Sequence, residues 1–143
     1  MLVKFAKQLH RSLVLLLSLS FPVFAAAETD FYKGKTLNII VSTDAGTGYD
    51  IYARTIARHW TNHIPGNPNI VVQNMTGAGG LRTANLLYNV TAKDGLTLGL
   101  VQSTVPFEPF FGNKSASFDA MKFNWIGTPS QEVLTVIVWH TVP

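Results

Sequence analysis

The alternation of apolar and polar positions divides this chain into short apolar runs and amphipathic stretches. β-Branched and other apolar residues fill Thr36–Val41, 69–73 and 96–101, which predicts three strands, the first of them buried. Between them, apolar residues recur at helical spacing over about 50–60 and 81–90, which predicts two amphipathic helices. This strand-helix-strand-helix-strand order is typical of an α/β fold with parallel pairing and right-handed crossovers.

The buried face of the first helix is expected to consist of Tyr52, Ala53, Ile56, Ala57 and Trp60. For the second helix we expect Leu81, Ala84, Leu87 and Tyr88. Further along, the pattern predicts a short helix over 106–111, a short strand or hinge over 123–127 and a strand over 133–139. A largely apolar strand is usually internal to a fold, so its place at the end of the chain suggests a truncated sequence.

Glycine-rich turns stand where the first two strands lead into the helices, at 44–50 and 75–80. A helix that begins there exposes backbone N–H groups without intrahelical partners, and its aligned peptide dipoles add partial positive charge. Consecutive βα units place both turns at the carboxyl ends of neighbouring parallel strands, where open α/β sheets bind ligands. We therefore predict an anion site, for a carboxylate, that is built mainly from backbone.

Three polar side chains near these turns have two interpretations each. Asp50 is interpreted as the N-cap of the first helix, and a contact to a cationic group of the ligand is the alternative. Asn74 is expected to brace the turn or to pair with the ligand. Arg82, in the first turn of the second helix, belongs to a solvated face or makes a charge-assisted contact to a carboxylate.

The start of the chain has the features of a secretory signal peptide. Lys4, Lys7 and Arg11 precede an apolar run over 13–24, and three alanines at 25–27 complete a cleavage pattern. The run is shorter than the ~20 residues of a spanning helix, so we predict cleavage after Ala27, without stable membrane insertion afterwards. The formal charge of +3 comes from the three basic residues of this leader, since the other eight basic residues balance the eight acidic ones. Nucleic acid is therefore not an expected partner.

Several kinds of chemistry lack their sequence signals. The chain has no cysteine, which excludes a disulfide framework, a thiol nucleophile and a cysteine metal site. Gly46 and Gly48 form part of a dinucleotide fingerprint whose third glycine is missing. His59 and His63 have a spacing that can hold zinc, but the glutamate of the HExxH motif is absent, and we predict no metal and no cofactor. No nucleophile elbow is present, and we expect the protein not to be an enzyme.

An ordered set of short motifs runs through most of 36–127. These motifs are NIIV at 38–41, GTGYDIYAR at 46–54, PGNP at 65–68, VQNMTGAGG at 72–80, AKDGLTLG at 92–99 and KFNWIG at 122–127. The set resembles the extracytoplasmic receptors of tripartite tricarboxylate transporters, the Bug-type solute receptors. Those receptors are longer and have two α/β lobes that hold the solute in a cleft.

The resemblance implies one lobe of the type II periplasmic-binding-protein kind, with a mostly parallel sheet. It implies that 28–132 form this first lobe and that 133–143 begin a crossover strand to an absent second lobe, so that the fold is incomplete. With Asp50 and Asn74 added from their position at the turns, the expected ligand-binding residues are Ala45, Gly46, Thr47, Gly48, Tyr49, Asp50, Asn74, Thr76, Gly77, Ala78, Gly79, Gly80 and Ser103. Many members carry proline and more glycine in the first turn. This chain instead has Asp44 near the expected anion site, and its charge suggests a ligand that also carries a cationic group.

The leading hypothesis is a periplasmic receptor that captures a small organic carboxylate and delivers it to the permease subunits of a membrane transporter. Backbone amides would hold the ligand, and the lobes would close about a hinge. Two alternatives stay open at this point. One is a secreted α/β enzyme that acts on a carboxylate, and the other is a truncated receptor fragment without function.

Overall fold

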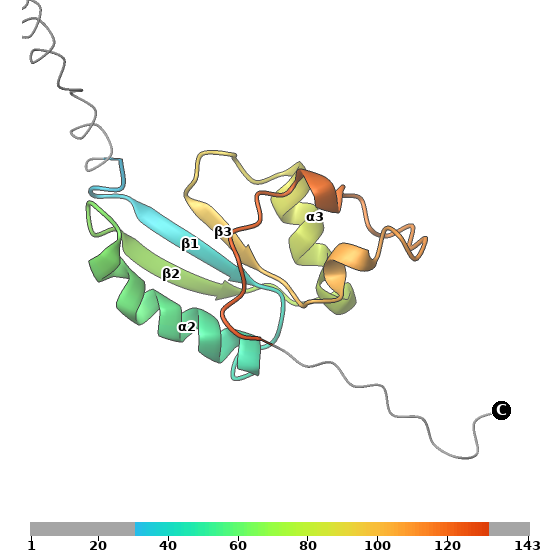
Figure 1. Ribbon diagram of the computed structural model, residues 1–143, viewed down its shortest axis with the longest axis horizontal. Helices are drawn as coiled ribbons and strands as arrows, with labels where there is room; N and C mark the ends of the chain where they lie inside the picture. The colour runs from blue at the N-terminus through green and yellow to red at the C-terminus, as the bar shows by residue number, and fades with distance from the viewer. Residues whose placement is uncertain (1–30, 132–143) are drawn as a thin grey trace, which may run out of the picture.

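The computed structural model describes residues 31–131 (Figure 1). The predicted signal peptide over 1–27 lies outside the described residues, and so do the strand predicted over 133–139 and the crossover segment that it would begin. Within the described part, the chain forms a three-stranded sheet and two α-helices, in the order predicted from the apolar pattern.

The three strands are parallel, and they are β1 (Thr36–Val41), β2 (Asn69–Asn74) and β3 (Thr97–Leu100). Their order in the sheet is β2-β1-β3, so that β1 is central. A central parallel strand is covered on both faces, which explains why its residues are apolar almost without interruption. The predicted parallel α/β sheet is confirmed, and each of its three strands is found within one residue of its expected ends.

The two helices are α2 (Gly48–Trp60) and α3 (Leu81–Asn89), and they lie on opposite faces of the sheet (Figure 1). Ile39 packs with Ala53 of α2. The next residue of β1 faces the other way, as side chains alternate along a strand. On that other face Gly99 of β3 is so close to α3 that an added Cβ would lie 2.0 Å from a methyl carbon of Leu87. Glycine at this position therefore permits the approach of α3 to β3.

After β3, the chain folds back against α3 in short turns. Buried apolar residues from this segment pack with those of the helix, and this cluster consists of Leu81, Ala84, Val105, Phe118 and Ala120. The four 3₁₀ turns of the described chain are Thr61–His63, Ala78–Gly80, Val105–Phe107 and Ala120–Lys122. The cluster secures the segment that follows β3 beside the N-terminal end of α3.

Some local predictions were wrong. The helix expected over 106–111 is a single 3₁₀ turn, Val105–Phe107, followed by further turns. For 123–127, expected as a short strand or a hinge, the structure has no strand, and the hinge stays a prediction. Tyr52 was expected on the buried face of α2 but is 41% exposed, while Ala53 is buried. This happens because α2 packs mainly on β1 and β2, so that within 31–131 little covers the part of the helix that carries Tyr52.

Candidate functional site

The loops that follow the three strands lie next to one another at the carboxyl edge of the sheet. The backbone N–H of Met75, after β2, donates to the carbonyl of Val41 at the end of β1, at 2.8 Å. The N–H of Ser103, after β3, donates to the hydroxyl of Tyr49 at the start of α2, at 3.3 Å. The predicted meeting of the two glycine turns and the third strand end is therefore found in the structure.

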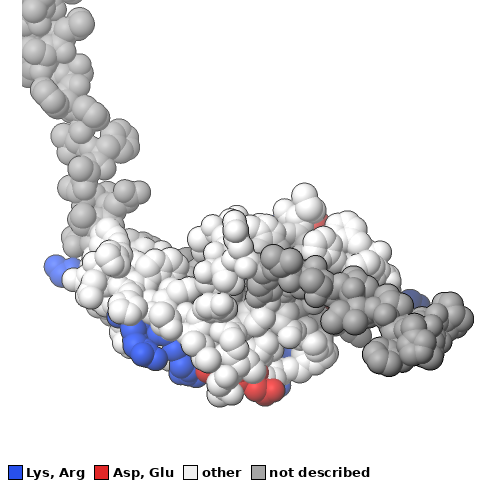
Figure 2. All heavy atoms as spheres, turned by 60° about the horizontal axis from the view of Figure 1, so that its bottom comes forward, with Lys and Arg blue, Asp and Glu red and all other residues white. Residues whose placement is uncertain are grey.

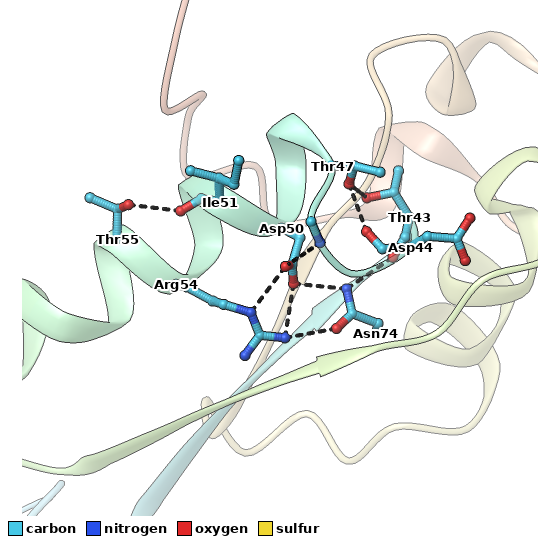
Figure 3. Close-up of polar contacts among 9 residues, drawn as sticks. Thr43, Asp44, Thr47, Asp50, Ile51, Arg54, Thr55 and Asn74 are labelled. Carbon is cyan, nitrogen blue, oxygen red and sulfur yellow. Dashed lines mark hydrogen bonds and ion pairs between the residues drawn. The ribbon is translucent and has the colours of Figure 1, made fainter.

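The first turn leads directly into α2. Thr47 occupies the N-cap position with extended backbone angles, and its side chain makes no capping hydrogen bond. Its hydroxyl donates instead to the carbonyl of Asp44 at 2.8 Å, and it lies 2.7 Å from the hydroxyl of Thr43 (Figure 3). These bonds hold the turn closed ahead of the helix, so that its N–H groups are presented at the N-terminus of α2.

The prediction that Asp50 is the N-cap was wrong. Asp50 is the third residue of α2, and its Oδ2 accepts from the N–H of Gly46 at 2.8 Å, upstream of the N-cap residue. A carboxylate at the third helical position commonly reaches back in this way to an N–H at the start of the helix. Asp50 thus stabilises the turn from inside the helix, and its carboxylate is occupied by protein groups.

Asp50, Arg54 and Asn74 form one hydrogen-bonded network beneath the first turn (Figure 3). Arg54 donates from Nε to Oδ2 of Asp50 at 3.0 Å, and its Nη2 lies 3.0 Å from Oδ1 of the same carboxylate. Asn74 donates from Nδ2 to Oδ1 of Asp50 at 2.9 Å and to the carbonyl of Thr43 at 3.0 Å. Its own Oδ1 accepts from Nη2 of Arg54 at 2.9 Å.

The network keeps Asp50 ionised. The hydrogen bond from Arg54 is the main reason why the pKa of Asp50 falls from its ordinary value of 3.8 to about 2, and the bonds from Gly46 and Asn74 act in the same direction. Burial of the side chain, which is 4% exposed, opposes them. At neutral pH the carboxylate is therefore charged and fully engaged, and the guanidinium of Arg54 balances its charge.

The second turn has an unusual backbone. Gly77, Ala78, Gly79 and Gly80 have φ values of 132°, 48°, 62° and 95°, so that four consecutive residues lie at positive φ. For Ala78 this conformation is strained, because its Cβ crowds the backbone there. Strain of this kind persists where surrounding structure enforces it, and it is concentrated at functional sites.

Buried contacts hold the second turn in place. The hydroxyl of Thr83, which is fully buried, donates to the carbonyl of Met75 at 2.7 Å. Gly80 packs so closely that an added Cβ would lie 2.9 Å from Cγ2 of Val105 and 3.3 Å from Oγ of Ser42. That hydroxyl is buried and has no hydrogen-bond partner among the described residues. The turn is therefore fixed from below, by side chains that sequence analysis did not single out.

Above the turns, the backbone is open. A Cβ added at Gly46, Gly48 or Gly79 would meet no atom of the described chain within 4 Å. Ala45 and Ser103 are exposed, and Thr76 is half-buried. A ligand can therefore approach these positions of both turns without displacing a side chain, as a backbone site for an anion requires. The N–H groups of Gly46 and Gly80 are already bonded, to Asp50 and to the carbonyl of Gly77, so the donors for an anion come from the other residues of the turns.

Of the predicted site residues, Asn74 is used as a brace, which was one of its two expected roles, and Arg82 is exposed beside Gly77. Sequence analysis did not single out Arg54. Its four-residue spacing from Asp50 on one helix was the available signal, because side chains at that spacing can pair. The distant partner Asn74 could not be read from the spacing.

A broad hollow of about 1440 Å³ lies alongside the outer edge of β3, and its lining is mostly apolar. Tyr52, Trp60 and Leu98 contribute to the lining. Of the predicted site residues only Tyr49 and Ser103 line it, so that most of the two glycine turns lies outside this hollow. In the view of Figure 2, basic and acidic side chains adjoin each other on the side that carries α2, and most of this face is uncharged.

Within 31–131, no cluster of histidine and acidic side chains is suited to hold a metal ion. Over the same residues, every helix is too short or too polar to cross a membrane. No family model matches this chain, and no curated protein sequence matches it.

Proposed function

We propose that this chain is the first lobe of an extracytoplasmic solute receptor, which binds the carboxylate of a small organic acid on its two glycine turns. The observation that carries the proposal is the adjacency of these turns at one edge of a parallel sheet, each at the beginning of a helix and each with an open backbone. Two helix N-termini at one place provide N–H donors and partial positive charge for an anion.

The electrostatics of the turns favour this ligand class over a cation. Asp50 is the buried acid beneath the site, and Arg54 balances its charge. Asp44 is exposed, and Figure 3 shows its carboxylate pointing away from Arg54 and Asn74. An acid at the rim of an anion site suits a ligand that carries an amino group beside its carboxylate, and aspartate is such a ligand.

The remaining parts of the proposal come from the sequence. The predicted leader supports an exported, periplasmic location, and the resemblance supports a lobe of the type II binding-protein kind. In such receptors a second lobe closes over the solute, and the loaded receptor delivers it to membrane permease subunits. No chemical step on the ligand is proposed, because the site consists of peptide groups and braced side chains.

The proposal can be tested by titrating the protein with citrate and with aspartate while amide resonances are followed by NMR. The largest shifts are expected at Gly46, Gly48 and Gly79. Gly79→Val is expected to abolish binding, since its side chain would enter the open space above the turn. Gly112→Val is the matched control, because Gly112 has a similar φ of 75° and equally open surroundings outside the site. Unchanged affinity in Gly79→Val, or resonance shifts confined to other regions, would refute the proposal.

A further inference from the structure

Arg54 is the one cationic side chain in the network beneath the turns. It stands on α2, one helical turn after Asp50, and its side chain is 43% exposed. Its guanidinium donates to two different partners, with two contacts to the carboxylate of Asp50 and one to the amide oxygen of Asn74. A planar guanidinium can form such a set of bonds at one time, whereas a lysine ammonium cannot reproduce this geometry.

The two partners of Arg54 belong to different turns. Asp50 binds the N–H of Gly46 in the first turn. Asn74 is the last residue of β2 and leads directly into the second turn, while its Nδ2 holds the carbonyl of Thr43 before the first. Arg54 therefore adds a link between the two turns, beside the direct bond from Asn74 to Asp50.

Charge gives Arg54 a second effect on the same site. The carboxylate of Asp50 lies directly under the first turn, 2.8 Å from the N–H of Gly46. Without Arg54 this buried negative charge would stand unbalanced beside the N–H groups that are proposed to receive an anion, and like charges repel strongly where water is excluded. The loss of the hydrogen bonds and the loss of the positive charge therefore both predict weaker anion binding when Arg54 is replaced.

We infer that Arg54 is a positioning residue of this site: through Asp50 and Asn74 it fixes the two glycine turns relative to each other, and it cancels the charge of Asp50 beneath the ligand. Arg54 is assigned this role rather than a ligand contact, because its Nε and Nη2 donate to the two partners beneath the turns. The inference builds on the proposed function, but the coupling between the turns is a property of the protein without ligand.

The first experiment therefore uses the ligand-free protein and compares amide NMR spectra of Arg54→Gln and Arg54→Lys with the unsubstituted protein. Arg58→Gln is the control, as Arg58 is an exposed arginine one turn further along α2. Arg54→Gln is expected to shift the resonances of both Gly46 and Gly77, and Arg58→Gln to shift neither. If Arg54→Gln shifts the resonance of Gly46 but not that of Gly77, Arg54 does not couple the two turns, and the inference is overturned.

The second experiment measures affinity for citrate and aspartate by calorimetry. Arg54→Gln is expected to weaken binding about tenfold or more, which corresponds to the loss of hydrogen bonds to a charged group. Arg54→Lys retains the positive charge but not the planar set of N–H donors, so it should recover only part of the lost affinity. Full recovery by lysine would overturn the positioning role, and so would wild-type affinity in Arg54→Gln.

The two inferences can fail separately. If the unsubstituted protein binds neither acid, the proposed function fails, while the ligand-free spectra still decide whether Arg54 couples the turns. If Arg54→Gln does not fold, as judged by circular dichroism, Arg54→Lys supplies the same comparison, because it keeps a cation opposite Asp50.

Discussion

Gly80 and Gly79 are neighbours with the same backbone requirement but different surroundings, and alanine at each position separates the two effects. Both residues lie at positive φ, 95° for Gly80 and 62° for Gly79. An alanine Cβ at Gly80 would lie 2.9 Å from Cγ2 of Val105, which is 1% exposed. At Gly79 the same Cβ would meet nothing within 4 Å.

The expected losses of unfolding free energy follow from the cost of positive φ and the cost of the close contact. Left-handed backbone costs an L-residue about 1–2 kcal/mol, and both variants bear that cost. Only Gly80→Ala also forces extra volume into packed surroundings, which costs about 1–3 kcal/mol more. Val105 is β-branched and held by its neighbours, so it has little freedom to rotate away. We expect a loss of unfolding free energy of about 2–5 kcal/mol for Gly80→Ala and about 1–2 kcal/mol for Gly79→Ala.

Urea unfolding followed by circular dichroism measures both values, and the slopes should agree if the transition remains two-state. Thermal unfolding offers a second measure, since 1 kcal/mol corresponds to roughly 4–8 °C in a domain of this size. Equal losses in the two variants would refute the close packing of Gly80 on Val105. A loss at Gly79 as large as that expected for Gly80 would refute the open surroundings of Gly79.

Three further predictions concern other contacts. Gly99→Ala should lower the unfolding free energy by about 1–3 kcal/mol, because its Cβ meets Leu87; in a double-mutant cycle, Leu87→Ala should remove most of that penalty. Thr83→Val should cost about 1–2 kcal/mol in urea unfolding, because the carbonyl of Met75 loses the hydroxyl of the buried Thr83 as its donor, whereas Thr83→Ser should cost less. The folded-state pKa of Asp50, about 2, lies below its ordinary 3.8, so its contribution to stability is complete above that ordinary value and is lost as the pH falls from 3.8 to about 2. Asp50→Asn should show a flatter dependence of unfolding free energy on pH over that interval, and an unchanged dependence would contradict the network.

The apolar pattern predicted the strands well, because β1 is central and buried on both faces. Leu37, Ile39, Ile40 and Val41 form a nearly continuous run that only a covered strand tolerates. The glycine turns were also placed correctly, since glycine before a helix is a local signal. Local patterns of this kind extend over a few residues and need no knowledge of the rest of the fold.

The errors arise where partners are distant in sequence. Asp50 was taken for an N-cap from its position alone. The choice between the N-cap and the third helical position depends on where the helix begins, and α2 begins after Thr47. Arg54 and Asn74 are 20 residues apart, and only the parallel pairing of β1 with β2 brings them together. The exposure of Tyr52 likewise depends on what covers α2, which its helical spacing could not reveal.

A site made of peptide groups has to be held by something other than the turns themselves. Glycine is flexible, and a chain at positive φ in four consecutive residues, one of them Ala78, would not keep this conformation alone. The structure provides the constraint from beneath, through Thr83 under the second turn and the Asp50–Arg54–Asn74 network under the first. Affinity for the proposed ligand would therefore be altered by changes to these braces as well as by changes to the exposed turns, which is why Arg54 is as informative a position for substitution as any glycine.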